Sequence, residues 1–168
     1  MTQKIFFVLA VAAMLVACNQ NTPDNPANQN NAAFAKAMYF EVLGTNTVPN
    51  VEGANKDQPF ILNNVRAAAR IVSETTMDIY LYGITFSSKM PVTIDMVIPA
   101  ASYTRSAEKI IISGENIAPT IKGKSFDSYM ITDLSGFITA DSLAIRNNYG
   151  TYRNCTFAGK ITKMSISL

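Results

Sequence analysis

Apolar and polar residues alternate along most of this chain, and this period of two constrains its fold more than any other feature. The alternation begins near Ala35, and apolar residues after that point are rarely spaced as on one face of a helix. In VRAAARIV (65–72) the odd positions are apolar, while Arg66 and Arg70 point the other way. Successive side chains of a strand lie on opposite faces, so the pattern predicts an all-β protein.

The pattern predicts about eight strands joined by short turns. The first lies near AMYFEVLG (37–44), and a polar loop follows over 44–59. The clearest alternation is in PVTIDMVIP (91–99), where prolines bracket the strand because they cannot extend it. MITDLSGFITADSLAIRN (130–147) predicts a hairpin with its turn near 140–141. Short strands at regular spacing favour an antiparallel sandwich or a closed barrel.

In the last predicted strand the apolar residues change from odd to even positions. In NCTFAGKITKMSISL (154–168) the apolar residues stand at odd positions up to Ile161 and at even positions from Met164. One buried face can be kept only with an extra residue, so the pattern predicts a β-bulge near Thr162 and Lys163.

The predicted interior contains no ionisable group except one thiol. It consists of Val65, Ala67, Ala69, Ile71, Met77, Ile79, Leu81, Val92, Ile94, Met96, Ile98, Ile110, Ile112, Leu134, Leu143, Ile145, Cys155 and Phe157.

The start of the chain predicts export. Lys4 precedes an apolar run over 5–17, which is too short to cross ~30 Å of hydrocarbon as a helix and fits a secretory signal. The run ends in Leu-Val-Ala-Cys (15–18), which resembles the lipobox of bacterial lipoproteins. The resemblance implies cleavage before Cys18 and lipid on that residue. An ordinary signal peptide that ends near a cysteine is the alternative.

Residues 19–31, NQNTPDNPANQNN, hold no aliphatic residue larger than alanine. Such a segment buries too little apolar area to offset the entropy of ordering it. We therefore predict a signal peptide over 1–17, a lipidated Cys18 with a disordered tether over 18–31, and one domain over 32–168. No acidic run follows Cys18 that could mark export to the cell surface, which favours an outer-membrane anchor facing the periplasm.

Charge and amino-acid content argue against some classes of partner and site. The chain carries 14 Lys and Arg against 12 Asp and Glu, and removing Lys4 with the signal leaves it nearly neutral. This argues against nucleic acid as a partner. The second of its two cysteines, Cys155, has no partner if Cys18 is acylated, so we predict a buried thiol. The chain has no histidine, which argues against a zinc site.

Two short motifs match catalytic patterns but fail on geometry. The spacing of Ser106 and Lys109 occurs in acyl-transfer enzymes, which need both side chains on one helix face, whereas a strand or turn separates them. Gly-Lys-Ser at 123–125 lacks the earlier glycine of a phosphate-binding loop. Asp78 and Asp95 alternate with apolar residues on outward faces, where a solvated charge is ordinary. The sequence thus predicts a protein that is not an enzyme, with no catalytic residue, metal or cofactor.

Three segments carry a resemblance to a known family. YGITFSSKMPVTIDMVIP (82–99), SGFITADSLAIRN (135–147) and CTFAGK (155–160) resemble the calycin-like lipoproteins of Bacteroidetes, which are small lipocalin-like β-barrels. The resemblance covers roughly 60–163 and implies an eight-stranded antiparallel barrel. It carries no catalytic residues to transfer. The Gly-x-Trp of lipocalins is missing, since the chain has no tryptophan.

Two weaker signals concern the surface. Asp141-Ser142-Leu143 resembles the O-glycosylation site of periplasmic proteins in the same bacteria, which marks Ser142 as a candidate for a glycan. A group of aromatic residues is open to two interpretations, a recognition surface for sugar rings or a protein, and packing between barrel and loops. The group consists of Tyr80, Tyr82, Phe86, Tyr149 and Tyr152.

Together these features predict a cell-envelope lipoprotein whose non-catalytic barrel binds a small hydrophobic ligand. Eight strands can either fill their interior or hold one ligand, and two methionines on the inner face can adapt to it. The candidate ligand contacts are Ala67, Ala69, Met77, Ile79, Leu81, Ile94, Met96, Leu134 and Phe157. The alternative is an interaction lipoprotein with a solid barrel whose loops bind a protein or glycan partner. It differs by a closed core and by aromatic residues concentrated on the loops.

Overall fold

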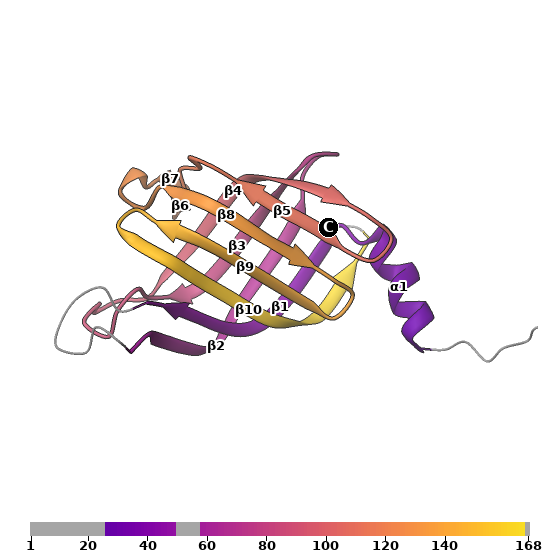
Figure 1. The fold of residues 1–168 in the computed structure, drawn as a ribbon, viewed down its shortest axis with the longest axis horizontal. Coiled ribbons are helices and arrows are strands. Elements are labelled where there is room, and N and C mark those ends of the chain that lie inside the picture. Colours follow the sequence, from indigo (N-terminus) through magenta and orange to yellow (C-terminus); the bar gives the residue numbers. More distant parts are fainter. Residues whose placement is uncertain (1–25, 50–57, 167–168) are drawn as a thin grey trace, which may run out of the picture.

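The computed structural model describes residues 26–49 and 58–166. In this part of the chain a helix precedes ten strands, most of which form one sheet that closes on itself (Figure 1). The elements are α1 (Pro26–Lys36), β1 (Tyr39–Val48), β2 (Phe60–Ile71), β3 (Thr76–Ile84), β4 (Ile94–Arg105), β5 (Ile110–Gly114), β6 (Thr120–Ile121), β7 (Lys124–Ser125), the 3-10 helix η1 (Asp127–Tyr129), β8 (Ile131–Ile138), β9 (Ser142–Tyr149) and β10 (Tyr152–Ser165).

Eight of these strands make a closed antiparallel barrel. Neighbours follow in the order β1, β2, β3, β4, β5, β8, β9 and β10, and β10 pairs with β1 to complete the ring. The short hairpin of β6 and β7 lies beside β4. The prediction of an all-β fold with an eight-stranded antiparallel barrel is confirmed, and the connectivity is consistent with a calycin-like or lipocalin-like barrel.

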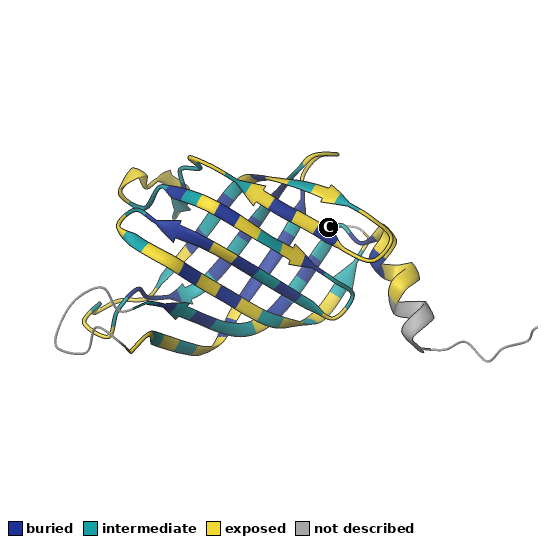
Figure 2. Cartoon of the chain, in the orientation of Figure 1, coloured by how far each residue is buried: buried dark blue, intermediate teal, exposed yellow. Residues whose placement is uncertain are grey.

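Buried and exposed residues alternate along the strands (Figure 2). The predicted interior residues are buried with two exceptions, Val92 and Ile94. Val92 was predicted wrongly: it precedes β4, lies in the loop after β3, and is 60 % exposed. Ile94 opens β4 and is half-buried against the core.

The predicted bulge in the last strand is confirmed. Glu41 of β1 pairs with Lys163, and the next residue, Val42, pairs with Ile161, so Thr162 is the extra residue in β10. The bulge lets Met164 pack against the core although its parity differs from that of Ile161.

Three boundaries differ from the sequence prediction. β4 continues through Pro99 to Arg105, although this proline was expected to end the strand. α1 begins at Pro26, so it overlaps residues 26–31 of the predicted disordered tether, where no helix was expected. β1 continues to Val48, which makes the predicted polar loop over 44–59 wrong for 44–48. The signal peptide, Cys18, the tether before Pro26 and residues 50–57 of that loop lie outside the described residues. No helix in the part of the chain that the structure describes has the length and hydrophobicity needed to cross a bilayer.

α1 lies at one end of the barrel, which we call the helix end (Figure 1). Its Phe34 is fully buried, with its ring centroid 5.9 Å from that of Phe40 on β1. Arg105, at the end of β4, donates hydrogen bonds to the carbonyls of Ala35 (3.3 Å) and Ala37 (2.5 Å). The last carbonyls of a helix lack partners within the helix, and an arginine satisfies them well. The opposite end, with the β3–β4 and β9–β10 connections, is the loop end.

Cys155 lies fully buried on β10, as predicted. Burial raises the pKa of its thiol from 9.0 to about 12, because the surrounding apolar side chains cannot solvate a thiolate.

We expect this buried thiol to weaken the fold at alkaline pH. Between its ordinary pKa and about 12 the unfolded chain loses the proton while the folded chain keeps it. The free energy of unfolding therefore falls as pH rises, by about 1.4 kcal/mol per pH unit for this group. Urea unfolding of the wild type and Cys155→Ala at several pH values measures the slope. The stability difference between them should shrink above about pH 9, and parallel curves would contradict the prediction.

Candidate interaction surface

The predicted ligand contacts lie inside the barrel, in close contact with their neighbours. Apart from the half-buried Ile94, each is at most 3 % exposed, and Met77, Ile79 and Leu81 are fully buried. A void that could hold a ligand would leave exposed surface on the side chains around it, because a water-sized sphere would touch them. The space around these residues is therefore filled by side chains.

An aromatic cluster closes the loop end. Phe86, from the β3–β4 connection, has its ring centroid 4.8 Å from that of Tyr129 and 5.2 Å from that of Tyr152. Tyr149, at the end of β9, is 5.0 Å from Phe86, and its burial raises the pKa of its hydroxyl. These four rings pack between barrel and loops. The stack continues outward to Phe126, 5.1 Å from Tyr129 and 41 % exposed, which the sequence analysis did not single out.

The other two predicted aromatics lie on the outer face of β3. Tyr80 and Tyr82 stack with ring centroids 6.3 Å apart. Two arginines of β2 lie over them, Arg66 with its guanidinium carbon 5.4 Å from the Tyr82 centroid and Arg70 at 5.6 Å from Tyr80. Burial raises the pKa of both tyrosine hydroxyls. Each ring thus has contacts with an arginine and with the other tyrosine.

The structure corrects the prediction that Asp78 and Asp95 are merely solvated charges. Asp78 forms an ion pair with Arg70 at 2.7 Å and accepts the backbone N–H of Ala100 at 3.1 Å. Asp95 accepts the backbone N–H of Gly83 at 2.8 Å. Both carboxylates hold strands in place.

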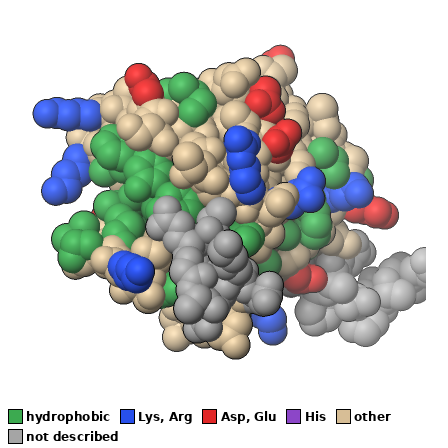
Figure 3. Space-filling model, turned by 60° about the vertical axis from the view of Figure 1, so that its left-hand side comes forward, with side chains coloured by type: hydrophobic (Ala, Val, Ile, Leu, Met, Phe, Trp, Pro, Cys, Tyr) green, Lys and Arg blue, Asp and Glu red, His purple; other side chains and the backbone are tan. Residues whose placement is uncertain are grey.

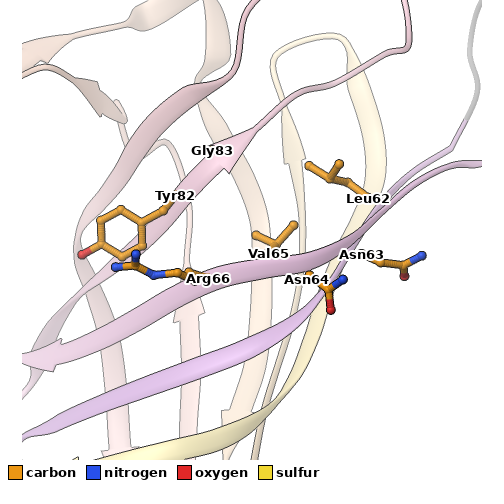
Figure 4. A pocket seen from close by; sticks show the side chains of 7 residues that line it. All are labelled: Leu62, Asn63, Asn64, Val65, Arg66, Tyr82 and Gly83. Atoms are coloured by element: carbon orange, nitrogen blue, oxygen red, sulfur yellow. The ribbon is translucent and has the colours of Figure 1, made fainter.

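A groove opens at the loop end where β3 parts from β2. It encloses about 320 Å³ (Figure 4), and its walls are Leu62, Asn63, Asn64, Val65, Arg66, Tyr82 and Gly83. Its shape comes from two backbone features. Asn64 has a φ of 57° at a bulge of β2 against β1, and Gly83 has a φ of 65° where β3 turns away.

Exposed apolar side chains lie at the same end of the barrel as the groove. Ile61 at the start of β2 is 52 % exposed, and Phe126 and Val92 are exposed on loops of the same end. The space-filling view with this end turned forward shows hydrophobic side chains gathered there, with a few lysines and arginines around them (Figure 3). We call Ile61, Val92 and Phe126 the apolar rim. Surfaces of this kind are common at protein interaction sites.

The remaining sequence candidates are separate from this surface. Ser106 caps the β4–β5 turn, where its Oγ accepts the backbone N–H of Lys109 at 3.2 Å. Ser142 is half-buried in the β8–β9 turn at the helix end, with its hydroxyl 3.0 Å from that of Thr139. Within residues 26–49 and 58–166, no three Asp, Glu or Cys side chains come together as metal ligands.

The sequence analysis missed the groove, although one signal was present. Two consecutive asparagines, Asn63 and Asn64, interrupt the alternation of a strand. Asparagine adopts positive φ more readily than most residues, so such a pair inside a strand indicates a bulge. No family model matches the chain, and no curated protein matches it either.

Proposed function

We propose that this protein is a lipid-anchored interaction module of the cell envelope. Its barrel is solid, and the loop end binds a protein partner. The observation that supports the proposal is the packing of the interior: the side chains expected to touch a ligand belong to the core, and all but Ile94 are buried. The lipobox supports the anchor at Cys18, and the lack of an acidic run after Cys18 supports a place on the periplasmic side of the outer membrane.

The surface of the loop end supports the second part of the proposal. The apolar rim leaves three large side chains in water, and the groove adds polar and charged groups beside them. Protein interfaces combine an apolar centre with a polar border and often with arginine and aromatic side chains. Binding of a hydrophobic ligand inside the barrel stays a prediction, and the following experiment separates it from binding at the surface.

We expect residues 26–168, purified without lipid, to take up no fatty acid in native mass spectrometry. A filled interior leaves no site for an acyl chain, and opening one would cost the packing of several side chains. The matched control is Ile61→Ser with Phe126→Ser, which removes apolar surface outside the barrel. Uptake of one fatty acid by both proteins would overturn the solid barrel, because the control excludes adsorption to the rim.

A further inference from the structure

The groove lies against a length of β2 that has a strand on one side only. β3 pairs with β2 from Arg66 to Ile71, and no described strand continues this pairing over residues 60–65. On its other side the same stretch pairs with β1, with Phe60 opposite Val48. Backbone N–H and C=O groups along such an edge are ready to pair with another chain.

β3 is turned away from this edge by specific contacts. Gly83 has positive φ, and its N–H donates to Asp95 of β4. The next residue, Ile84, pairs with Ile94 of β4 and is fully buried. The chain of β3 therefore cannot return to cover residues 60–65 without breaking contacts with the core. No other described strand fills the space beside this part of β2, where the groove lies.

Along the groove, one face of β2 is apolar and the other is polar. Leu62 and Val65 point to one side of the strand, and Asn63 and Asn64 to the other (Figure 4). A strand laid along β2 would place its own alternating side chains against these two kinds of surface.

One arginine at the groove has no acidic partner within the part of the chain that the structure describes. Arg66 stacks on Tyr82 but forms no ion pair among the described residues, whereas Arg70, on the same outer face, is bound to Asp78. An arginine held by an aromatic ring is preorganised to bind a carboxylate through two parallel hydrogen bonds. A carboxylate is therefore the group that Arg66 is best placed to bind.

A second copy of the chain would not supply that anion through the same edge. Residues 58–66, QPFILNNVR, contain no aspartate or glutamate. Two such edges paired over these residues would add a second Arg66 and no carboxylate from the paired stretch itself. A different protein fits the edge better.

We propose that the edge of β2 over residues 60–65 accepts an extended peptide of a partner protein as an added strand. A carboxylate of that peptide, from an acidic side chain or its C-terminus, is bound by Arg66. Main-chain hydrogen bonds supply affinity in this mode of recognition, and side-chain pockets supply specificity. The inference rests on the proposed function, since it names the site and the class of partner for the same module.

The test is selection of a random displayed peptide library on residues 26–168, followed by fluorescence anisotropy with the peptides obtained. We expect acidic peptides whose affinity falls by about tenfold or more with Arg66→Glu. Arg70→Gln is the matched control, because it removes an arginine of the same face that already has a partner, and it should leave affinity nearly unchanged. N-methylation along the peptide should weaken binding at every second residue, since alternate amides face β2.

The outcomes separate the inference from the proposed function. Two results would overturn the strand-addition site: peptides that bind Arg66→Glu as tightly as the wild type, or binding that does not weaken at every second N-methylated residue. The protein would then remain an interaction module that uses another site. Failure to obtain any peptide, together with concentration-dependent dimers abolished by Ile61→Lys, would overturn it in favour of a second copy. Failure to obtain peptides together with uptake of fatty acid would overturn both.

Discussion

Phe40→Ala is expected to lower the free energy of unfolding by about 3–5 kcal/mol. Phe40 is fully buried on β1 and is among the largest side chains of the core. Its removal leaves a cavity that the closed ring of strands cannot collapse, because both neighbours of β1 are held in register over most of its length. Urea unfolding followed by circular dichroism measures the change.

The effect should reach the helix as well as the barrel. The Phe40 ring contacts Phe34, whose burial attaches α1 to the helix end. We expect faster amide hydrogen exchange in α1 of Phe40→Ala than in the wild type. Leu43→Ala is the matched control, because Leu43 lies on the same strand and is 44 % exposed. Its cost should stay within about 0.5 kcal/mol, and equal losses for the two variants would contradict the assignment of Phe40 to the core.

Gly44→Ala is expected to cost about 3 kcal/mol. Gly44 lies directly opposite Gly159 where β1 and β10 complete the barrel. A Cβ atom at position 44 would collide with the carbonyl oxygen of Ala158 and would come within 2.6 Å of the Cα of Gly159. Both are backbone atoms, so the two strands would have to move apart and the closing hydrogen bonds would weaken.

Gly123→Ala is the control for this prediction. Gly123 has a φ of 75° in the β6–β7 turn, and a Cβ there would meet nothing within 4 Å. It therefore reports the cost of backbone conformation without a collision, which is about 1–2 kcal/mol. Thermal unfolding of both variants separates the two causes. A loss at position 44 no larger than at 123 would show that the closure has room for a side chain.

The barrel could be predicted from sequence because apolar and polar residues alternate strictly along most strands. Val65, Ala67, Ala69 and Ile71 are all buried where the pattern placed them, and the change of parity after Ile161 correctly required a bulge. These inferences depend on local geometry alone, since side-chain direction in a strand is fixed by position.

The parts that could not be predicted depend on contacts distant in sequence. α1 is rich in asparagine and alanine, and its place is fixed by Phe34 and by Arg105, about seventy residues away, which no local pattern reveals. Phe86 was open to two interpretations, and the tyrosines that bury it come from η1 and the β9–β10 hairpin, far away in sequence. The groove depends on where β3 stops pairing with β2. The pattern of hydrophobic residues does not show where this pairing stops.

The attachment of α1 also sets a direction for the whole protein. The chain enters the barrel at the helix end (Figure 1), whereas the residues of the groove and the apolar rim belong to the opposite, loop end. A chain held to a bilayer by the proposed lipid at Cys18 would therefore present the groove and the apolar rim on the side remote from the lipid. The height of the barrel, roughly 25 Å for strands of this length and tilt, adds to the reach of the tether. Such a polarity suits a partner that approaches from the aqueous phase better than one embedded in the same leaflet.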